Sequence, residues 1–147
     1  MVNFTGVFTI LATMAWIAFA EPSRIDTAKR AAETTHIGEI AFYDVGGVEG
    51  TCGHTDSDSY PAVSMSYDLF KKNGRTNCDQ WMHITNPANG ESAYGRVRNY
   101  CDGCGAEYDL DLSRSLFQSL AGSEGLSIGR IYGIEWNFEP IGFQPPN

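Results

Sequence analysis

The chain has 147 residues and carries 10 lysines and arginines against 18 aspartates and glutamates, for a net charge of −8. A chain this acidic gains nothing from counterion release, so we expect neither nucleic acid nor an anionic membrane as its partner. The length suits one domain with a modest core.

An apolar stretch near the N-terminus, Val7–Ala20, contains no charged residue. It is shorter than the roughly 20 apolar residues that a membrane span needs. It closes on Ala18-Phe19-Ala20, which places small residues at the −3 and −1 positions of a signal-peptidase site. We therefore predict a signal peptide over residues 1–20 and a secreted protein, extracellular or in a cell wall.

The next segment, residues 21–36, is polar and lacks aromatic residues, which predicts a disordered leader. It contains Lys29-Arg30, a dibasic pair of the kind that secretory convertases cut. Cleavage there would start the mature chain at Ala31. The alternative is that the two residues are only a solvated charge pair.

Beyond the leader, the sequence indicates short strands with two brief helices. The segment 46–61 is rich in Gly, Ser and Asp and is predicted to be a long loop. Helices are expected after Ser66 and Ser113, which can cap them, and each ends at a glycine. The expected strands cover residues 37–44, 62–66, 81–86, 91–100 and parts of 126–141. This pattern favours a small, mainly β barrel.

Four cysteines, Cys52, Cys78, Cys101 and Cys104, allow three interpretations. A zinc site could combine Cys101 and Cys104 with Cys52 and His54, but an oxidising compartment disfavours it. A redox pair would open a helix, whereas the expected helix begins nine residues after Cys104. We therefore predict two disulfides, one closing the tight 101–104 turn and one closing the 52–78 loop, and no metal.

The order GEIAFYDVGGVEGTCG, NCDQWMHITNPANG, VRNYCDGCGAEYDLDLSRSLFQSLA and GRIYGIEWNF resembles secreted double-psi β-barrel domains. These include expansins, loosenins, barwin and rare lipoprotein A-like proteins. The resemblance covers residues 37–139 and implies a six-stranded double-psi β-barrel with two short helices, stabilised by disulfides. It is strongest to single-domain fungal loosenin-like proteins, with only a short tail, 140–147, expected after the barrel. The barwin-like relatives also support pairing of Cys52 with Cys78.

The resemblance implies a role for Asp111 in the LDLS motif. The matching aspartate is needed for wall loosening in expansins and is the general acid of family 45 glycoside hydrolases. Burial between two leucines would raise the pKa of Asp111, whereas bonds to a helix N-terminus would lower it. Asp44 is the candidate base, or alternatively a plain loop carboxylate. Asn99 stands where expansin-like sequences often carry a second acid, and an amide cannot shuttle protons.

Aromatic residues could supply platforms for sugar rings. Tyr43 and Tyr100 are the preferred candidates and Trp81 a further one, whereas Trp136 is expected in the core. We assign no ligand role to His83 and expect His54 to be a solvated loop residue.

The sequence therefore predicts a monomeric protein that binds polysaccharide (cellulose, chitin or a related glucan) and could loosen it without hydrolysis. One alternative is a secreted inhibitor of a host or microbial protease, or a barwin-like defence protein, with the 46–61 loop as its contact surface. A further alternative is a weak family-45-like endoglucanase. No dinucleotide or flavin motif is present, so no cofactor is expected.

Overall fold

A computed structural model of the chain describes residues 34–146. The predicted signal peptide and most of the predicted leader, including Lys29-Arg30, lie outside the described residues. The first strand begins at His36, the last residue assigned to that leader. Within the described part of the chain, no helix is long and apolar enough to cross a membrane.

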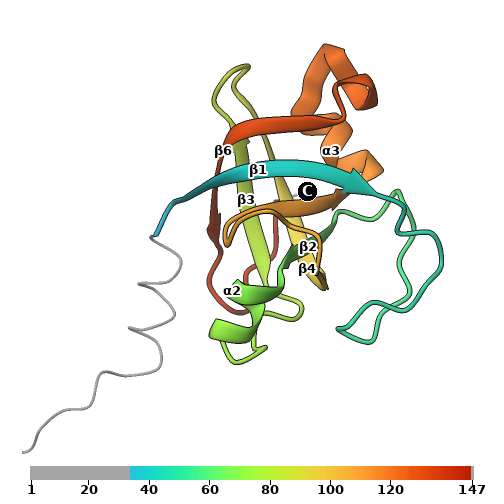
Figure 1. The fold of residues 1–147 in the computed structure, drawn as a ribbon, viewed down its shortest axis with the longest axis vertical. Helices are drawn as coiled ribbons and strands as arrows, with labels where there is room; N and C mark the ends of the chain where they lie inside the picture. Colours follow the sequence, from blue (N-terminus) through green and yellow to red (C-terminus); the bar gives the residue numbers. More distant parts are fainter. Residues whose placement is uncertain (1–33, 147) are drawn as a thin grey trace, which may run out of the picture.

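Six strands close into one barrel in the order β1-β5-β2-β4-β3-β6 (Figure 1). Their bounds are β1 His36–Tyr43, β2 Ala62–Ser66, β3 Trp81–Asn86, β4 Glu91–Cys101, β5 Leu110–Ser113 and β6 Arg130–Phe138. Two pairings are parallel, β1 with β5 and β2 with β4, and the other four are antiparallel. The predicted six-stranded barrel is therefore confirmed.

Two helices close the ends of the barrel. The helix α2 (Tyr67–Lys72) lies at one end, and α3 (Arg114–Ala121) with the 3-10 turn η1 (Gly122–Ile128) lies at the other (Figure 1). Ser66 caps α2 as predicted, because its hydroxyl accepts a hydrogen bond from the Leu69 backbone N–H at 3.3 Å. Ser113 does not cap α3 through its side chain. That prediction was wrong, because the Ser113 hydroxyl is fully buried at the end of β5.

Side chains from all six strands fill the barrel, and their burial alternates most clearly along β3. In β3, Met82, Ile84 and Asn86 are buried, whereas the residues between them are half-buried. Trp136 in β6 is 1% exposed, as predicted, and its indole N–H donates to the Tyr108 carbonyl at 2.9 Å. The helix α3 adds Leu116, Phe117 and Leu120 to the same core.

The two predicted disulfides are both formed. Cys52 and Cys78 have Cα atoms 5.4 Å apart, and Cys101 and Cys104 have Cα atoms 5.6 Å apart. The first bond ties the long 46–61 loop to the segment before β3. The second closes the turn that leaves β4 and leads toward β5.

Candidate functional site

One row of residues crosses the outer surface of four neighbouring strands. Asp111 in β5 pairs with Ala41 of β1 on one side and with Ser64 of β2 on the other. Ser64 in turn pairs with Asn99 of β4. Strands lie about 4.8 Å apart, so two strand spacings, roughly 10 Å, separate the backbones of Asp111 and Asn99.

Asp111 is a half-buried carboxylate that has no hydrogen-bond or ion-pair partner among residues 34–146. Its neighbours in β5, Leu110 and Leu112, point into the core and are 1% and 0% exposed, so Asp111 points outward. No hydrogen bond or ion pair joins its carboxylate to another residue of the described chain. Burial raises its pKa, and the charge of Asp109 raises it further. Of the two opposing effects considered from the sequence, desolvation is therefore the larger.

The disulfide of the 101–104 turn lies against this carboxylate. The sulfur atoms of Cys101 and Cys104 and an oxygen of Asp111 are all within 4.8 Å of one another. Asp109 holds the segment after this turn against β1, because its carboxylate accepts hydrogen bonds from the backbone N–H groups of Glu39 at 3.0 Å and Ala106 at 2.6 Å. The turn thus forms one wall beside Asp111.

Tyr43 lies in β1, two residues beyond Ala41, the residue that pairs with Asp111. It pairs with Ser113 in register, and burial raises the pKa of its hydroxyl. The charges of Asp56, Asp111 and Asp58 raise this pKa too, whereas a hydrogen bond with Ser64 opposes the shift. Tyr43 thus lies within the electrostatic influence of both Asp111 and the acidic 46–61 loop.

Tyr43 also lines a surface pocket of about 260 Å³ between the end of β1, the loop and β4. The pocket residues that carry charge or an amide are Asp44, Glu49, His54, Asp56, Arg98 and Asn99. Asp44 is exposed at this rim and forms an ion pair with Arg114. The hydrogen bond and charge of Arg114 hold the pKa of Asp44 below its usual range.

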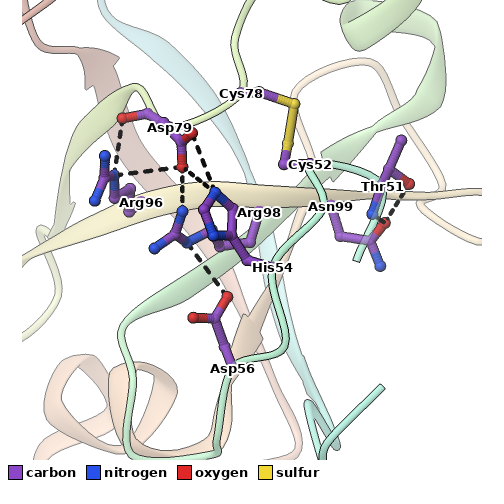
Figure 2. Close-up of a disulfide and its surroundings, with 9 residues drawn as sticks. All are labelled: Thr51, Cys52, His54, Asp56, Cys78, Asp79, Arg96, Arg98 and Asn99. Atoms are coloured by element: carbon purple, nitrogen blue, oxygen red, sulfur yellow. Dashed lines mark hydrogen bonds and ion pairs between the residues drawn. A yellow bond between two sulfur atoms is a disulfide. The ribbon is translucent and has the colours of Figure 1, made fainter. Parts of the chain in front are cut away.

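Arg98 organises the inner wall of the pocket (Figure 2). It is the extra residue of a bulge in β4, because Val63 pairs with Val97 and Ser64 with Asn99. Its side chain is 8% exposed and lies between two carboxylates, Asp56 at 3.3 Å and Asp79.

Further contacts extend this network. Arg98 donates to the Tyr60 hydroxyl at 2.8 Å, and its guanidinium lies 4.7 Å from the centre of the Tyr60 ring. His54 lies 3.1 Å from Asp79, so it is paired rather than simply solvated as expected. The network lies beside the Cys52–Cys78 bond, and together they hold the loop against the barrel (Figure 2).

Asn99 is bound to the same loop. Its side-chain oxygen accepts hydrogen bonds from the Thr51 backbone N–H at 3.1 Å and from the Thr51 hydroxyl at 2.6 Å. Asn99 therefore anchors the loop, at the position where the resemblance to expansin-like sequences led us to look for a second acid.

The other two predicted sugar platforms lie outside this pocket. Tyr100 is half-buried and packs against Tyr67 and Phe70 of α2, with ring centres 5.0 and 5.8 Å away. Trp81 lines a different pocket of about 230 Å³ beside the C-terminal segment, with the Arg96 guanidinium 5.6 Å from its ring centre. The structure therefore brings together Asp111 and Tyr43, with Asp44 at the rim of the same surface.

Sequence reasoning missed the roles of Arg98, Asp56 and Asp79. The sign in the sequence is the pair of arginines, Arg96 and Arg98, on either side of Val97 within one predicted strand. A buried arginine needs carboxylate partners. The 46–61 loop is rich in acidic residues and could supply one of them. The Asp44–Arg114 pair had no sequence sign, because 70 residues separate its partners.

Comparison with known proteins agrees with this architecture. No protein-family model matches the chain. A curated protein of Arthroderma benhamiae, described as an allergen Asp f 7 homolog, is 31% identical over 125 residues, which cover 76% of this chain and 42% of that protein. The chain thus spans less than half the length of this relative.

Two solved structures share the fold. The Streptomyces papain inhibitor superposes with a TM-score of 0.61 and 24% identity, over 73% of this chain and 96% of that one. An expansin from Clavibacter michiganensis also gives a TM-score of 0.61 with 24% identity, over 76% of this chain and 54% of that one. A mutant of this expansin has been crystallised with cellohexaose. The fold is thus that of a disulfide-stabilised double-psi β-barrel.

Proposed function

We propose that this protein is a secreted, expansin-like protein that binds cell-wall polysaccharide at the surface around Asp111 and Tyr43, and that it loosens the polymer without hydrolysis. The observation that carries the proposal is the unpartnered, half-buried Asp111 beside the half-buried ring of Tyr43. A raised pKa lets this carboxyl act either as a donor or as an acceptor toward a sugar hydroxyl. The tyrosine ring offers an apolar face for the sugar.

Asp44 and Asn99, the two side chains weighed from the sequence as partners of Asp111, are both engaged by other residues, and this supports binding without hydrolysis. An inverting glycosidase needs a second carboxylate about 6.5–9.5 Å from its acid. Asn99 occupies the row position roughly two strand spacings from Asp111, and its oxygen is occupied by Thr51. Asp44 is held in an ion pair with Arg114, which lowers its pKa and weakens it as a base.

The test is a pull-down of the mature protein on cellulose, chitin and a β-glucan, with released reducing sugar measured in the same tubes. We expect binding without sugar release, and weaker binding by Asp111→Asn and by Tyr43→Ala. Glu124→Gln is the matched control, because Glu124 is an exposed carboxylate on η1 at the α3 end of the barrel. Wild-type binding by both Asp111→Asn and Tyr43→Ala would refute the assigned surface. Sugar release lost in Asp111→Asn would instead identify a hydrolase.

Inhibition of a cysteine protease is a second candidate function, favoured by the rigid 46–61 loop. The Cys52–Cys78 bond and the Arg98 network fix this loop, and a loop that is already ordered loses little entropy on binding. Val48 is 75% exposed on this loop. If the loop is the contact surface, Val48→Asp abolishes inhibition of papain, whereas Asp111→Asn leaves it intact. No inhibition by the wild-type protein would exclude this function for papain.

A further inference from the structure

We propose that the pocket beside Tyr43 selects a positively charged glycan, a β-linked polymer of glucosamine, over neutral glucans and over acidic polysaccharides. This inference rests on the proposed function, because it specifies the polymer that the same surface takes. The argument for it compares the charged groups that already have a partner in the protein with those that remain free to contact a ligand.

The basic side chains at the pocket each contact a carboxylate. The buried Arg98 guanidinium lies between Asp56 and Asp79. His54 contacts Asp79 at 3.1 Å, and Arg114 at the rim contacts Asp44. An acidic sugar would therefore meet no unpaired cation among the described residues that line the pocket.

Two further carboxylates lie near Tyr43: Glu49 lines the pocket, whereas Asp111 lies on β5 outside the pocket lining. Glu49 is exposed at the pocket wall, and neither it nor Asp111 forms a side-chain hydrogen bond or ion pair with another residue of the described chain. Burial raises the pKa of the Tyr43 hydroxyl, and the negative charges of Asp56, Asp111 and Asp58 raise it further. The net charge of −8 would add long-range attraction for a cationic polymer.

The arrangement combines the aromatic face of Tyr43 with nearby carboxylates that can pair with a cation. A neutral glucan can use the Tyr43 ring and ordinary hydrogen bonds. A glucosamine unit can use the same contacts and can also place its ammonium group against Glu49 or Asp111, which makes charge-assisted hydrogen bonds. An acidic polymer gains no such contact and is repelled by the same two carboxylates.

The experiment compares three hexamers by titration calorimetry in a mildly acidic buffer of low ionic strength. They are the glucosamine hexamer, the N-acetylglucosamine hexamer and cellohexaose. We expect the glucosamine hexamer to bind about tenfold more tightly than the two neutral ones, as two partly exposed ion pairs would give. The preference should shrink as salt is added, because salt screens exposed charges.

Variants assign the preference to the pocket. Glu49→Gln and Asp111→Asn should each lower affinity for the glucosamine hexamer by about two- to fivefold. Glu49→Gln should lower the affinity for cellohexaose by less than it lowers that for the glucosamine hexamer, because a neutral sugar makes no ion pair. Glu124→Gln removes the same charge at the α3 end of the barrel and should change nothing. Hexalysine carries similar charge without a sugar ring and should bind more weakly than the glucosamine hexamer.

Each outcome decides the inference. Equal affinity for charged and neutral hexamers overturns the charge selection but leaves polysaccharide binding standing. Hexalysine binding as tight as the glucosamine hexamer, or equal losses in Glu124→Gln and Glu49→Gln, would show attraction to any polycation and overturn it as well. If no hexamer binds and the pull-down also fails, both proposals are wrong.

Discussion

Removal of either disulfide tests how the two bonds divide the stabilisation of the barrel. The perturbations are two double variants, Cys52→Ala/Cys78→Ala and Cys101→Ala/Cys104→Ala. The first bond closes a loop of 27 residues and the second a loop of four, since their sequence separations are 26 and 3. Loop closure in the unfolded chain then predicts losses of about 3.5 kcal/mol and about 1.9 kcal/mol.

The loss expected on removing the Cys52–Cys78 bond is a large part of the unfolding free energy of a small domain, which is typically about 5–15 kcal/mol. In the native state, however, the Cys52–Cys78 loop is also held by Arg98 through Asp56 and Asp79. The native geometry should therefore persist without the bond, and the loss should come from the unfolded chain. The unfolded chain also becomes more expanded, so the dependence of the unfolding free energy on urea should rise.

Urea denaturation followed by tryptophan fluorescence measures both quantities for the wild type and the two double variants. We expect the unfolding free energy to be highest for the wild type, lower for the 101–104 variant and lowest for the 52–78 variant. The two variants should differ by roughly 1.6 kcal/mol. The reasoning would be refuted if loss of the short bond cost as much as loss of the long one. Native contacts of the sulfur atoms, rather than chain entropy, would then dominate.

Three further substitutions test other parts of the structure. Burial raises the pKa of Asp111, so its ionised form opposes folding. Asp111→Asn should therefore raise the thermal midpoint at neutral pH. This gain should vanish as the pH falls below the ordinary aspartate range. Replacing Arg98 by Met leaves the 11%-exposed Asp56 uncompensated and should cost about 3 kcal/mol in urea denaturation, with part of the loss recovered in Arg98→Met/Asp56→Asn. Gly50→Ala places a methyl group 2.6 Å from the Arg98 carbonyl oxygen and should cost about 1–3 kcal/mol in the same assay. Gly103→Ala meets nothing within 4 Å and should be neutral.

Elements governed by local chemistry were predictable from the sequence. The strand Trp81–Asn86 has a clear period of two, and its bounds match the prediction. The cap at Ser66 and the basic end of α2 follow from side chains next to the helix. Cysteine pairing followed from the expected compartment and from family resemblance, and both bonds are present.

Features that depend on distant partners were not predictable. The 126–141 segment was expected to hold more than one strand, but it forms the turn η1 and the single strand β6. Ser113 has the sequence of a helix cap, yet the close of β5 buries its hydroxyl. The direction in which the pKa of Asp111 shifts could also not be predicted from the sequence. Burial would raise this pKa and a nearby helix N-terminus would lower it, and the structure shows that burial is the larger effect.

The position of β6 in the barrel affects the order in which a newly made chain can fold. This last strand pairs with both β1 and β3, so it supplies the final two seams of the closed sheet. Until Phe138 has left the ribosome, β1 and β3 each lack this partner and expose unpaired backbone groups. We expect nascent chains that end before β6 to need a chaperone or to associate through these edges, even where Cys52 and Cys78 are already joined.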